Sequence, residues 1–126
     1  MKITTFNPQI VSNDPEPIIK LFEELGFEKR HTKEGLGKLG MITYRMKDGN
    51  GFHIDITKPS LQLPQDRVGI RMNVDNFDDA YKLLQNHGFK NALGDDRIAE
   101  TGTSRNDVMK SPSGFMITLI QHVKKE

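Results

Sequence analysis

Apolar residues recur at helical spacing in the first part of the chain. Gly26 follows this stretch and predicts the end of a helix. Asn13 or Asp14 is the expected N-cap, and Pro15 and Pro17 suit only the first helical turn. The sequence therefore predicts an amphipathic helix between residue 14 and residue 26. The apolar positions of this helix are Ile18, Ile19, Phe22 and Leu25.

Strand-like stretches surround this helix. Residues 4–11 precede it, and residues 27–32, 40–47 and 52–57 follow it. The last two stretches are separated by Asp48-Gly49-Asn50-Gly51, a strong hairpin-turn signal. The order of elements in this part of the chain is thus β-α-β-β-β.

The second part of the chain repeats this order. Residues 68–74 alternate as a strand, a helical stripe of apolar residues follows, and Gly88 is expected to end the helix. Two or three strands come after it, the last over residues 115–121. The stretch 94–105 is polar, and we expect a long loop there, with Glu100, Arg105 and Asp107 as candidates for closing over a pocket. The stripe consists of Phe77, Ala80, Tyr81 and Leu84.

An internal repeat links the two parts. Leu-Phe-Glu-Glu-Leu-Gly-Phe at residues 21–27 is similar to Leu-Leu-Gln-Asn-His-Gly-Phe at residues 83–89, an offset of 62. Gly-Phe-His-Ile-Asp-Ile at residues 51–56 is similar to Gly-Phe-Met-Ile-Thr-Leu at residues 114–119, an offset of 63. Repeats of this length are whole supersecondary modules. We therefore expect one domain, with a first module over about residues 1–58, a linker over about 58–66 and a second module over about 67–126.

Composition narrows the functional classes. The chain of 126 residues has 18 Lys and Arg against 17 Asp and Glu, which gives no basic excess for nucleic acid or an anionic membrane. It has no cysteine, which excludes disulfides, thiolate metal sites and thiol catalysis. No apolar run approaches the length of a membrane span, and no signal-peptide stretch is present at the start. We therefore expect a cytoplasmic α+β protein.

The paired β-α-β-β-β modules, with Leu-Gly-Phe closing the first helix, resemble the vicinal oxygen chelate superfamily. This superfamily includes glyoxalase I, extradiol dioxygenases and bleomycin-resistance proteins. Ser-Pro-Ser-Gly-Phe-Met-Ile-Thr-Leu-Ile-Gln at residues 111–121 is similar to the ending that is usual in the superfamily. The resemblance covers essentially the whole chain. It implies an α+β fold in which two βαβββ modules form a curved mixed sheet around a cavity, and a homodimer.

Strand alternation assigns side chains to the two faces of the expected sheet. Phe6, Pro8, Ile10, Phe52, Ile54 and Ile56, with Val68, Ile70, Met72 and Val74, should face the helices. The face away from the helices is the one that the resemblance implies lines a cavity. Its candidate ligand-binding residues are Asn7, Gln9, His53, Asp55, Arg71, Asn73, Met116 and Thr118. Tyr44 joins them as an amphipathic wall, although the pattern does not decide whether Tyr44 or Arg45 points inward.

The resemblance also implies a metal site, with His or Glu on the first and fourth strands of each module. Mapped residue by residue, those positions are Asn7, Asp55, Gly69 and Thr118 in this chain. Only Asp55 is a credible ligand, with His53 two residues away on the same face. We therefore predict no metal and no cofactor, and this departure puts the lyase, isomerase and dioxygenase activities of the superfamily in doubt.

Arg71 is the fixed cation expected on the cavity face. A guanidinium suits carboxylates and phosphates, so Arg71 favours an anionic ligand, while an ion pair with Asp55 is the alternative. His53 beside Asp55 could bind a ligand or supply acid–base chemistry, or the two could simply share solvent. The amides of Asn7, Gln9 and Asn73 suit a polar ligand.

We therefore expect a metal-free, glyoxalase-like or bleomycin-resistance-like protein that binds a small polar or anionic molecule. The alternative is a metal-dependent lyase or isomerase with an atypical site anchored by Asp55. A module that only mediates assembly is a third possibility, and the polar lining counts against it. The sequence does not identify the ligand, whether a reaction is catalysed, or whether the modules pair within one chain or across the dimer.

Overall fold

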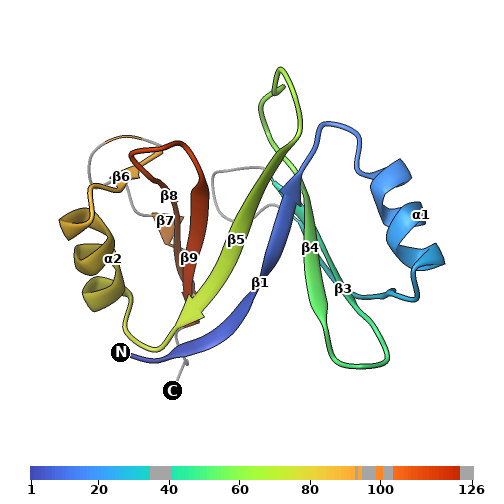
Figure 1. Cartoon of the computed structure of the whole chain (residues 1–126), viewed down its shortest axis with the longest axis horizontal. Helices are drawn as coiled ribbons and strands as arrows, with labels where there is room; N and C mark the ends of the chain where they lie inside the picture. Colours follow the sequence, from blue (N-terminus) through green and yellow to red (C-terminus); the bar gives the residue numbers. More distant parts are fainter. Residues whose placement is uncertain (35–40, 93, 95–98, 101–103, 123–126) are drawn as a thin grey trace. The chain divides into compact units, whose positions relative to one another are not determined.

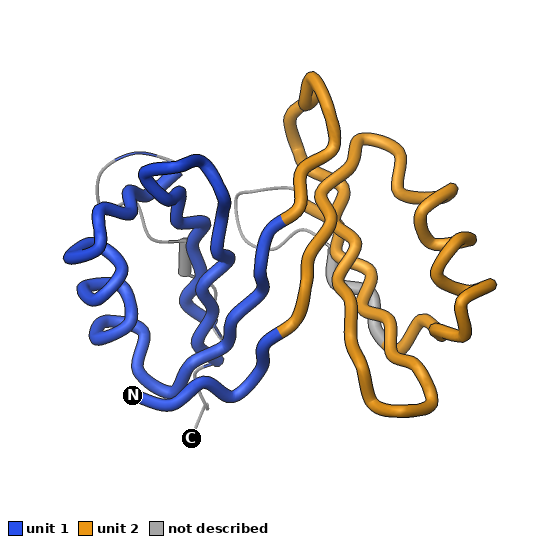
Figure 2. The backbone as a smooth tube through the Cα atoms, in the orientation of Figure 1, with its two compact units in different colours: residues 1–6, 69–126 blue, residues 7–68 orange. Residues whose placement is uncertain are grey.

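The computed structural model describes residues 1–34, 41–92, 94, 99–100 and 104–122. These residues divide into two compact units, which Figure 2 shows in different colours. Unit 1 contains residues 1–6 and the chain from residue 69 onward, and unit 2 contains residues 7–68. The boundary between the units lies two residues from the predicted start of the second module, but the first six residues belong with that module.

Unit 2 has the predicted order β-α-β-β-β (Figure 1). Strands β4 and β1 pair in parallel, and β2–β3 and β3–β4 pair antiparallel, so the strand order in this unit is β2-β3-β4-β1. Strand β1 starts in unit 1 and continues into unit 2. The elements are β1 (Ile3–Val11), α1 (Glu16–Glu24), β2 (Glu28–Glu34), β3 (Ile42–Lys47) and β4 (His53–Lys58).

Unit 1 repeats this order with one additional strand, because two short strands, β6 and β7, lie between α2 and β8. Strands β5 and β9 pair in parallel, β8 pairs antiparallel with β9, and β6 and β7 each pair with β8. The α+β class and the two βαβββ modules predicted from the sequence are confirmed. The elements are β5 (Arg67–Val74), α2 (Phe77–Asn86), β6 (Lys90–Asn91), β7 (Ala99–Glu100), β8 (Ser104–Lys110) and β9 (Met116–His122).

Each helix covers an apolar cluster on one face of the strands of its own unit. Under α1 the buried side chains are Ile19, Met46, Ile54 and Ile56. Under α2 the cluster is larger and includes the whole predicted helical stripe. The members of that cluster are Met72, Val74, Phe77, Ala80, Tyr81, Leu84, Met109, Ile117 and Leu119.

The expected helix-facing set is wrong at two positions in the middle of β1, at the residue before β4 and near the start of β5. Phe6, Phe52 and Val68 are 62%, 66% and 69% exposed, and Pro8 is exposed as well. A nine-residue strand such as β1 extends about 30 Å, whereas a nine-residue helix such as α1 extends only about 13 Å. Alternation assigns the face correctly, but it does not show how far along the strand a helix covers that face.

The predicted N-cap of α1 is also wrong. The N-cap is Pro15, and no side chain caps this helix. Asn13 instead binds the backbone of Leu63, donating from Nδ2 to the carbonyl oxygen at 2.8 Å and accepting from the amide at 2.9 Å. The expected linker is therefore attached to the start of α1 within unit 2.

Helix α2 is capped as its sequence allows. The side chain of Asn76 accepts from the backbone N–H of Asp79 at 3.1 Å. At the C-terminal end, Gly88 has a φ of +86°, which fits its predicted role as the stop. Among the described residues, no helix is long and apolar enough to cross a membrane.

Candidate ligand-binding faces of the two sheets

The face of the unit 2 sheet that points away from α1 is polar and buried. Gln9 donates from Nε2 to the hydroxyl of Thr57 at 3.0 Å, and the hydroxyls of Thr43 and Thr57 lie 3.1 Å apart. Strands β1, β4 and β3 each supply part of this network, because every second residue of a strand faces the same way. The predicted positions of Asn7, Gln9 and Asp55 on this face are confirmed. The buried polar side chains here are Asn7, Gln9, Thr43, Asp55 and Thr57.

Asn7 and Asp55 form the centre of this face. Nδ2 of Asn7 donates to the carbonyl oxygen of Pro8 at 2.9 Å and to Oδ1 of Asp55 at 3.2 Å. The carboxylate of Asp55 is 1% exposed. Oδ1 of Asn7 is buried and has no hydrogen-bond partner among the described residues. A buried acceptor of this kind has a substantial desolvation cost, and a ligand that donates a hydrogen bond would remove that cost.

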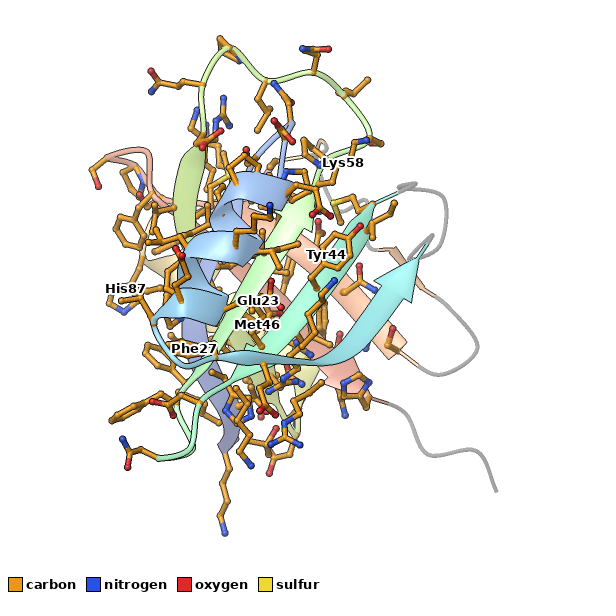
Figure 3. All side chains as sticks on the ribbon, turned by 90° about the vertical axis from the view of Figure 1, so that its right-hand side faces the viewer. Glu23, Phe27, Tyr44, Met46, Lys58 and His87 are labelled. Atoms are coloured by element: carbon orange, nitrogen blue, oxygen red, sulfur yellow. The ribbon has the colours of Figure 1, made fainter. Side chains whose placement is uncertain are left out.

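The β3–β4 hairpin settles the face that the sequence left open. Tyr44 packs on the apolar cluster under α1, on the same side of the sheet as Met46 (Figure 3). The ammonium of Lys29 lies 5.7 Å from the centre of the Tyr44 ring. The expectation that Tyr44 lines the polar face is therefore wrong.

Arg45 lies on the polar face instead, directly opposite Asp55 in the ladder, and Lys47 lies opposite His53. The turn fixes this register, since Asp48 accepts the amides of Asn50 and Phe52 and Gly51 has a φ of +90°. Counting outward from the Asp48–Gly51 turn would have found Arg45. Arg71 is consequently not the single fixed cation of the polar faces.

The corresponding face of unit 1 is built around Arg71. This side chain is 6% exposed, and its Nε donates to Oδ1 of Asn73 at 3.2 Å. Thr118 is level with Arg71 in the β5–β9 ladder, and Met116 is level with Gly69. Both Thr118 and Met116 are partly buried.

Strand β8 adds two polar residues to the unit 1 face that the sequence did not indicate. Ser104 and Asn106 are buried, and Nδ2 of Asn106 donates to the Ser104 hydroxyl at 3.3 Å. Ser104 was missed because residues 94–105 carry no clear period and were assigned to a loop, and Asn106 follows directly after that stretch.

Two of the residues that were expected to close over a pocket do not lie on a polar face. Arg105 and Asp107 belong to β8 and face α2, while nothing is described of the Glu100 side chain. The guanidinium of Arg105 lies 4.8 Å from the centre of the Phe77 ring and pairs with Asp78 at 3.0 Å. This hydrogen bond lowers the pKa of the Asp78 carboxyl below its usual range.

Asp107 is a carboxyl group buried under α2, with 1% of its surface exposed. It accepts from the backbone N–H of Val108 at 2.8 Å and from Nδ2 of Asn91, which also contacts the Tyr81 hydroxyl. Desolvation by burial outweighs both hydrogen bonds and raises the pKa of Asp107 to about 6. This cluster could not be predicted from the sequence, because it joins residues of three elements, α2, β6 and β8.

The four positions that the resemblance assigns to a metal do not fit one. Asp55 offers a carboxylate, but Asn7 and Thr118 offer only neutral oxygen atoms. Gly69 offers no side chain, and a Cβ built there would lie 2.8 Å from the carbonyl oxygen of Met116. Across the described part of the chain, no group of three or more His, Cys, Asp or Glu residues is arranged to hold a metal ion.

Comparisons with known proteins rest on structure. No family model matches the sequence, and no curated protein matches it. Among solved structures, a methylmalonyl-CoA epimerase from Mycobacterium tuberculosis is 14% identical, with 97% of this chain and 90% of that chain covered and a TM-score of 0.72. A hypothetical protein from Bacillus halodurans is 11% identical over 100% of this chain and 99% of that chain, with a TM-score of 0.69.

A Streptomyces coelicolor methylmalonyl-CoA epimerase variant, solved in complex with 2-nitronate-propionyl-CoA, is also similar. It is 15% identical over 98% of this chain and 100% of that chain, with a TM-score of 0.65. At these identities the likeness shows the fold alone, and it confirms at that level the resemblance seen in the sequence. The chain has the fold of the methylmalonyl-CoA epimerases, which belong to the vicinal oxygen chelate superfamily.

Proposed function

We propose that this chain binds a small polar or anionic molecule on the polar face of its sheet, without a metal ion. The observation that carries the proposal is that the guanidinium-bearing side chain of Arg71 is buried on the polar face of the strands of unit 1. A guanidinium presents a planar fork of N–H donors that fits the oxygens of a carboxylate or a phosphate. Arg71 on this face therefore favours a ligand that carries one of these groups.

The neighbours of Arg71 favour the same class of ligand. Asn73 holds the guanidinium through Nε, which orients the side chain along the sheet. Thr118, Ser104 and Asn106 add hydroxyl and amide groups, so this face can donate hydrogen bonds to an oxyanion. No covalent chemistry is needed for this function, and none is assigned to these residues.

The test is a comparison of Arg71→Gln with Arg30→Gln. Both variants remove one positive charge, but Arg30 is exposed and pairs only loosely with Glu28 at 3.9 Å. A panel of small carboxylates and phosphate monoesters is screened by thermal stability, because a ligand that binds only the native state raises the melting temperature. We expect Arg71→Gln to weaken any anion that binds by about tenfold or more.

Two outcomes would contradict this proposal. Either no anion in the panel raises the melting temperature of the wild-type protein, or Arg71→Gln binds each active anion as tightly as Arg30→Gln does. Arg71→Lys separates charge from shape, since it keeps the charge and loses the fork. We expect it to recover only part of the affinity.

An enzyme is the second candidate, favoured by the names of the structural neighbours. Two of these are methylmalonyl-CoA epimerases, and Asp55 is a buried carboxylate on the polar face of unit 2. The direct assay is epimerisation of methylmalonyl-CoA, with and without added Co²⁺, Mn²⁺ or Zn²⁺. Activity that requires a metal and disappears in Asp55→Asn would establish this candidate in place of simple binding.

A further inference from the structure

Three side chains form a row across the polar face of unit 2. Gln9 is level with Asp55 in the parallel β1–β4 ladder, so Asn7 is level with His53, two residues earlier on each strand. His53 is in turn directly opposite Lys47 in the antiparallel β3–β4 ladder. Asn7, His53 and Lys47 therefore lie side by side on β1, β4 and β3.

The two ends of this row can each bind a different group of one ligand. At one end, Oδ1 of Asn7 is a buried acceptor with no partner among the described residues. At the other end, Lys47 is partly buried and forms no ion pair within the described part of the chain. A molecule that donates a hydrogen bond to Asn7 and presents a negative charge to Lys47 would satisfy both.

The other charges of this face leave it positive. Arg45 is directly opposite Asp55, so the only buried carboxylate of the described unit 2 face has a guanidinium on the neighbouring strand. Glu28 is opposite Lys47 on β2, but its side chain is 76% exposed and it pairs with Arg30. The face thus carries two fixed cations against one buried carboxylate.

The same row in unit 1 has a different composition. The repeat places Gly69, Met116 and Lys110 at the positions of Asn7, His53 and Lys47. Glycine and methionine offer neither an acceptor side chain nor a donor, and Lys110 is exposed. Unit 1 therefore keeps the lysine without the rest of the row, and Lys110 serves as an internal control.

We propose that the row of Asn7, His53 and Lys47 is a subsite for a small organic acid that carries a hydroxyl group near its anionic group. This inference goes beyond the proposed function, because the row lies in unit 2 and Arg71 lies in unit 1. Neighbouring strands lie about 4.8 Å apart, so the backbones at Asn7 and Lys47 are about 10 Å apart. The two side chains project from the same face, so a short molecule is enough to contact both of them.

A β-hydroxy acid is a short molecule that carries both of the required groups. In such an acid the hydroxyl donates to Oδ1 of Asn7, and the carboxylate lies over His53 within reach of the flexible Lys47 stem. The matched probes are 3-hydroxybutyrate and butyrate, which differ by the one hydroxyl group. Binding is followed by the amide chemical shifts of the ¹⁵N-labelled full chain, a method that detects millimolar affinities and reports the site.

We expect 3-hydroxybutyrate to shift the signals of Asn7, Lys47 and His53, and to bind about fivefold more tightly than butyrate. Lys47→Gln should weaken both acids by about tenfold. Asn7→Ala should remove the preference for the hydroxy acid and leave butyrate unchanged. Lys110→Gln, the equivalent change in unit 1, should leave both affinities unchanged.

Other outcomes would overturn the subsite. Equal affinities of the two acids for the wild-type protein would exclude the Asn7 contact, and equal losses in Lys47→Gln and Lys110→Gln would exclude the row. Because Lys47 is only partly buried, its replacement tests the row even if Asn7→Ala does not fold. If anions still bind through Arg71 while neither acid shifts the unit 2 signals, the subsite fails and the proposed function stands. If no anion binds anywhere, the proposed function fails with it.

Discussion

The two units place different chemistry on the same framework. Met46 is opposite Ile54 in unit 2, and Met109 is opposite Ile117 in unit 1, so the apolar contact under each helix is repeated. At the next pair on the same face, the two units differ in residue type. Tyr44 is opposite Ile56 under α1, whereas Asp107 is opposite Leu119 under α2.

The polar faces diverge in the same way. Gln9 and Arg71 hold equivalent positions on β1 and β5, and one is a neutral amide while the other is a buried cation. Conversely, unit 2 has the carboxylate of Asp55 where unit 1 has Thr118. The repeat therefore preserves the residues that pack the helix on the sheet, and the residues around them are free to take different roles. Equivalent positions in the two units therefore predict how each helix packs on its strands, but they do not predict the residues of a binding site.

The largest effect should come from Phe77, because it anchors the better packed of the two helices. Its side chain is fully buried and stacks on Tyr81, with ring centres 5.8 Å apart. Phe77→Ala should lower the free energy of unfolding by about 3–5 kcal/mol. The position equivalent to Phe77 in unit 2 is Pro15, where Pro15→Ala should cost about 1 kcal/mol. Urea unfolding measures both.

If Phe77→Ala and Pro15→Ala lowered the free energy of unfolding equally, the two helices would not differ in how firmly their first residues are packed. A loss below about 1 kcal/mol in Phe77→Ala would mean that the cluster under α2 repacks around the cavity.

Asp107 should produce a smaller effect that depends on pH. Its pKa is raised to about 6 in the folded protein, above the ordinary value of 3.8. The folded state therefore holds the proton more tightly than the unfolded state, and this contribution to stability is lost as pH rises from about 4 to about 6. Relative to Asp107→Asn, the wild-type protein should lose about 3 kcal/mol between pH 4 and pH 7.

The control for Asp107 is the equivalent position in unit 2. Tyr44→Phe removes a hydroxyl and leaves every carboxyl group in place, so its difference from the wild-type protein should not vary between pH 4 and pH 7. The measurement is the free energy of unfolding in urea at several pH values. A constant difference between the wild-type protein and Asp107→Asn would show that the buried carboxyl has an ordinary pKa.

The fold followed from the sequence because it depends on local periodicity. The stripe of Phe77, Ala80, Tyr81 and Leu84 is buried as predicted, and the glycine at each helix end marks where the helix stops. The two segments of the repeat each predicted the order βαβββ, so the second segment supported the prediction made from the first.

The candidate site followed only in part, because it depends on register and on distant contacts. Alternation placed Asn7, Asp55 and Arg71 on the polar faces, but it could not choose between Tyr44 and Arg45 without counting from the turn. The cluster around Asp107 was beyond prediction, since it depends on Asn91 of a two-residue strand.

The smallest predicted effect distinguishes the starts of the two helices. Asn76→Ala removes the acceptor for the Asp79 amide and should lower the free energy of unfolding by about 1 kcal/mol. Asp14→Ala, just before α1, should leave it unchanged, because no side chain caps that helix. Hydrogen exchange at the Asp79 amide gives a local measurement, and it should accelerate in Asn76→Ala. If the exchange rate did not change, another group would have to hold this amide, and the cap would contribute nothing to the difference between the helices.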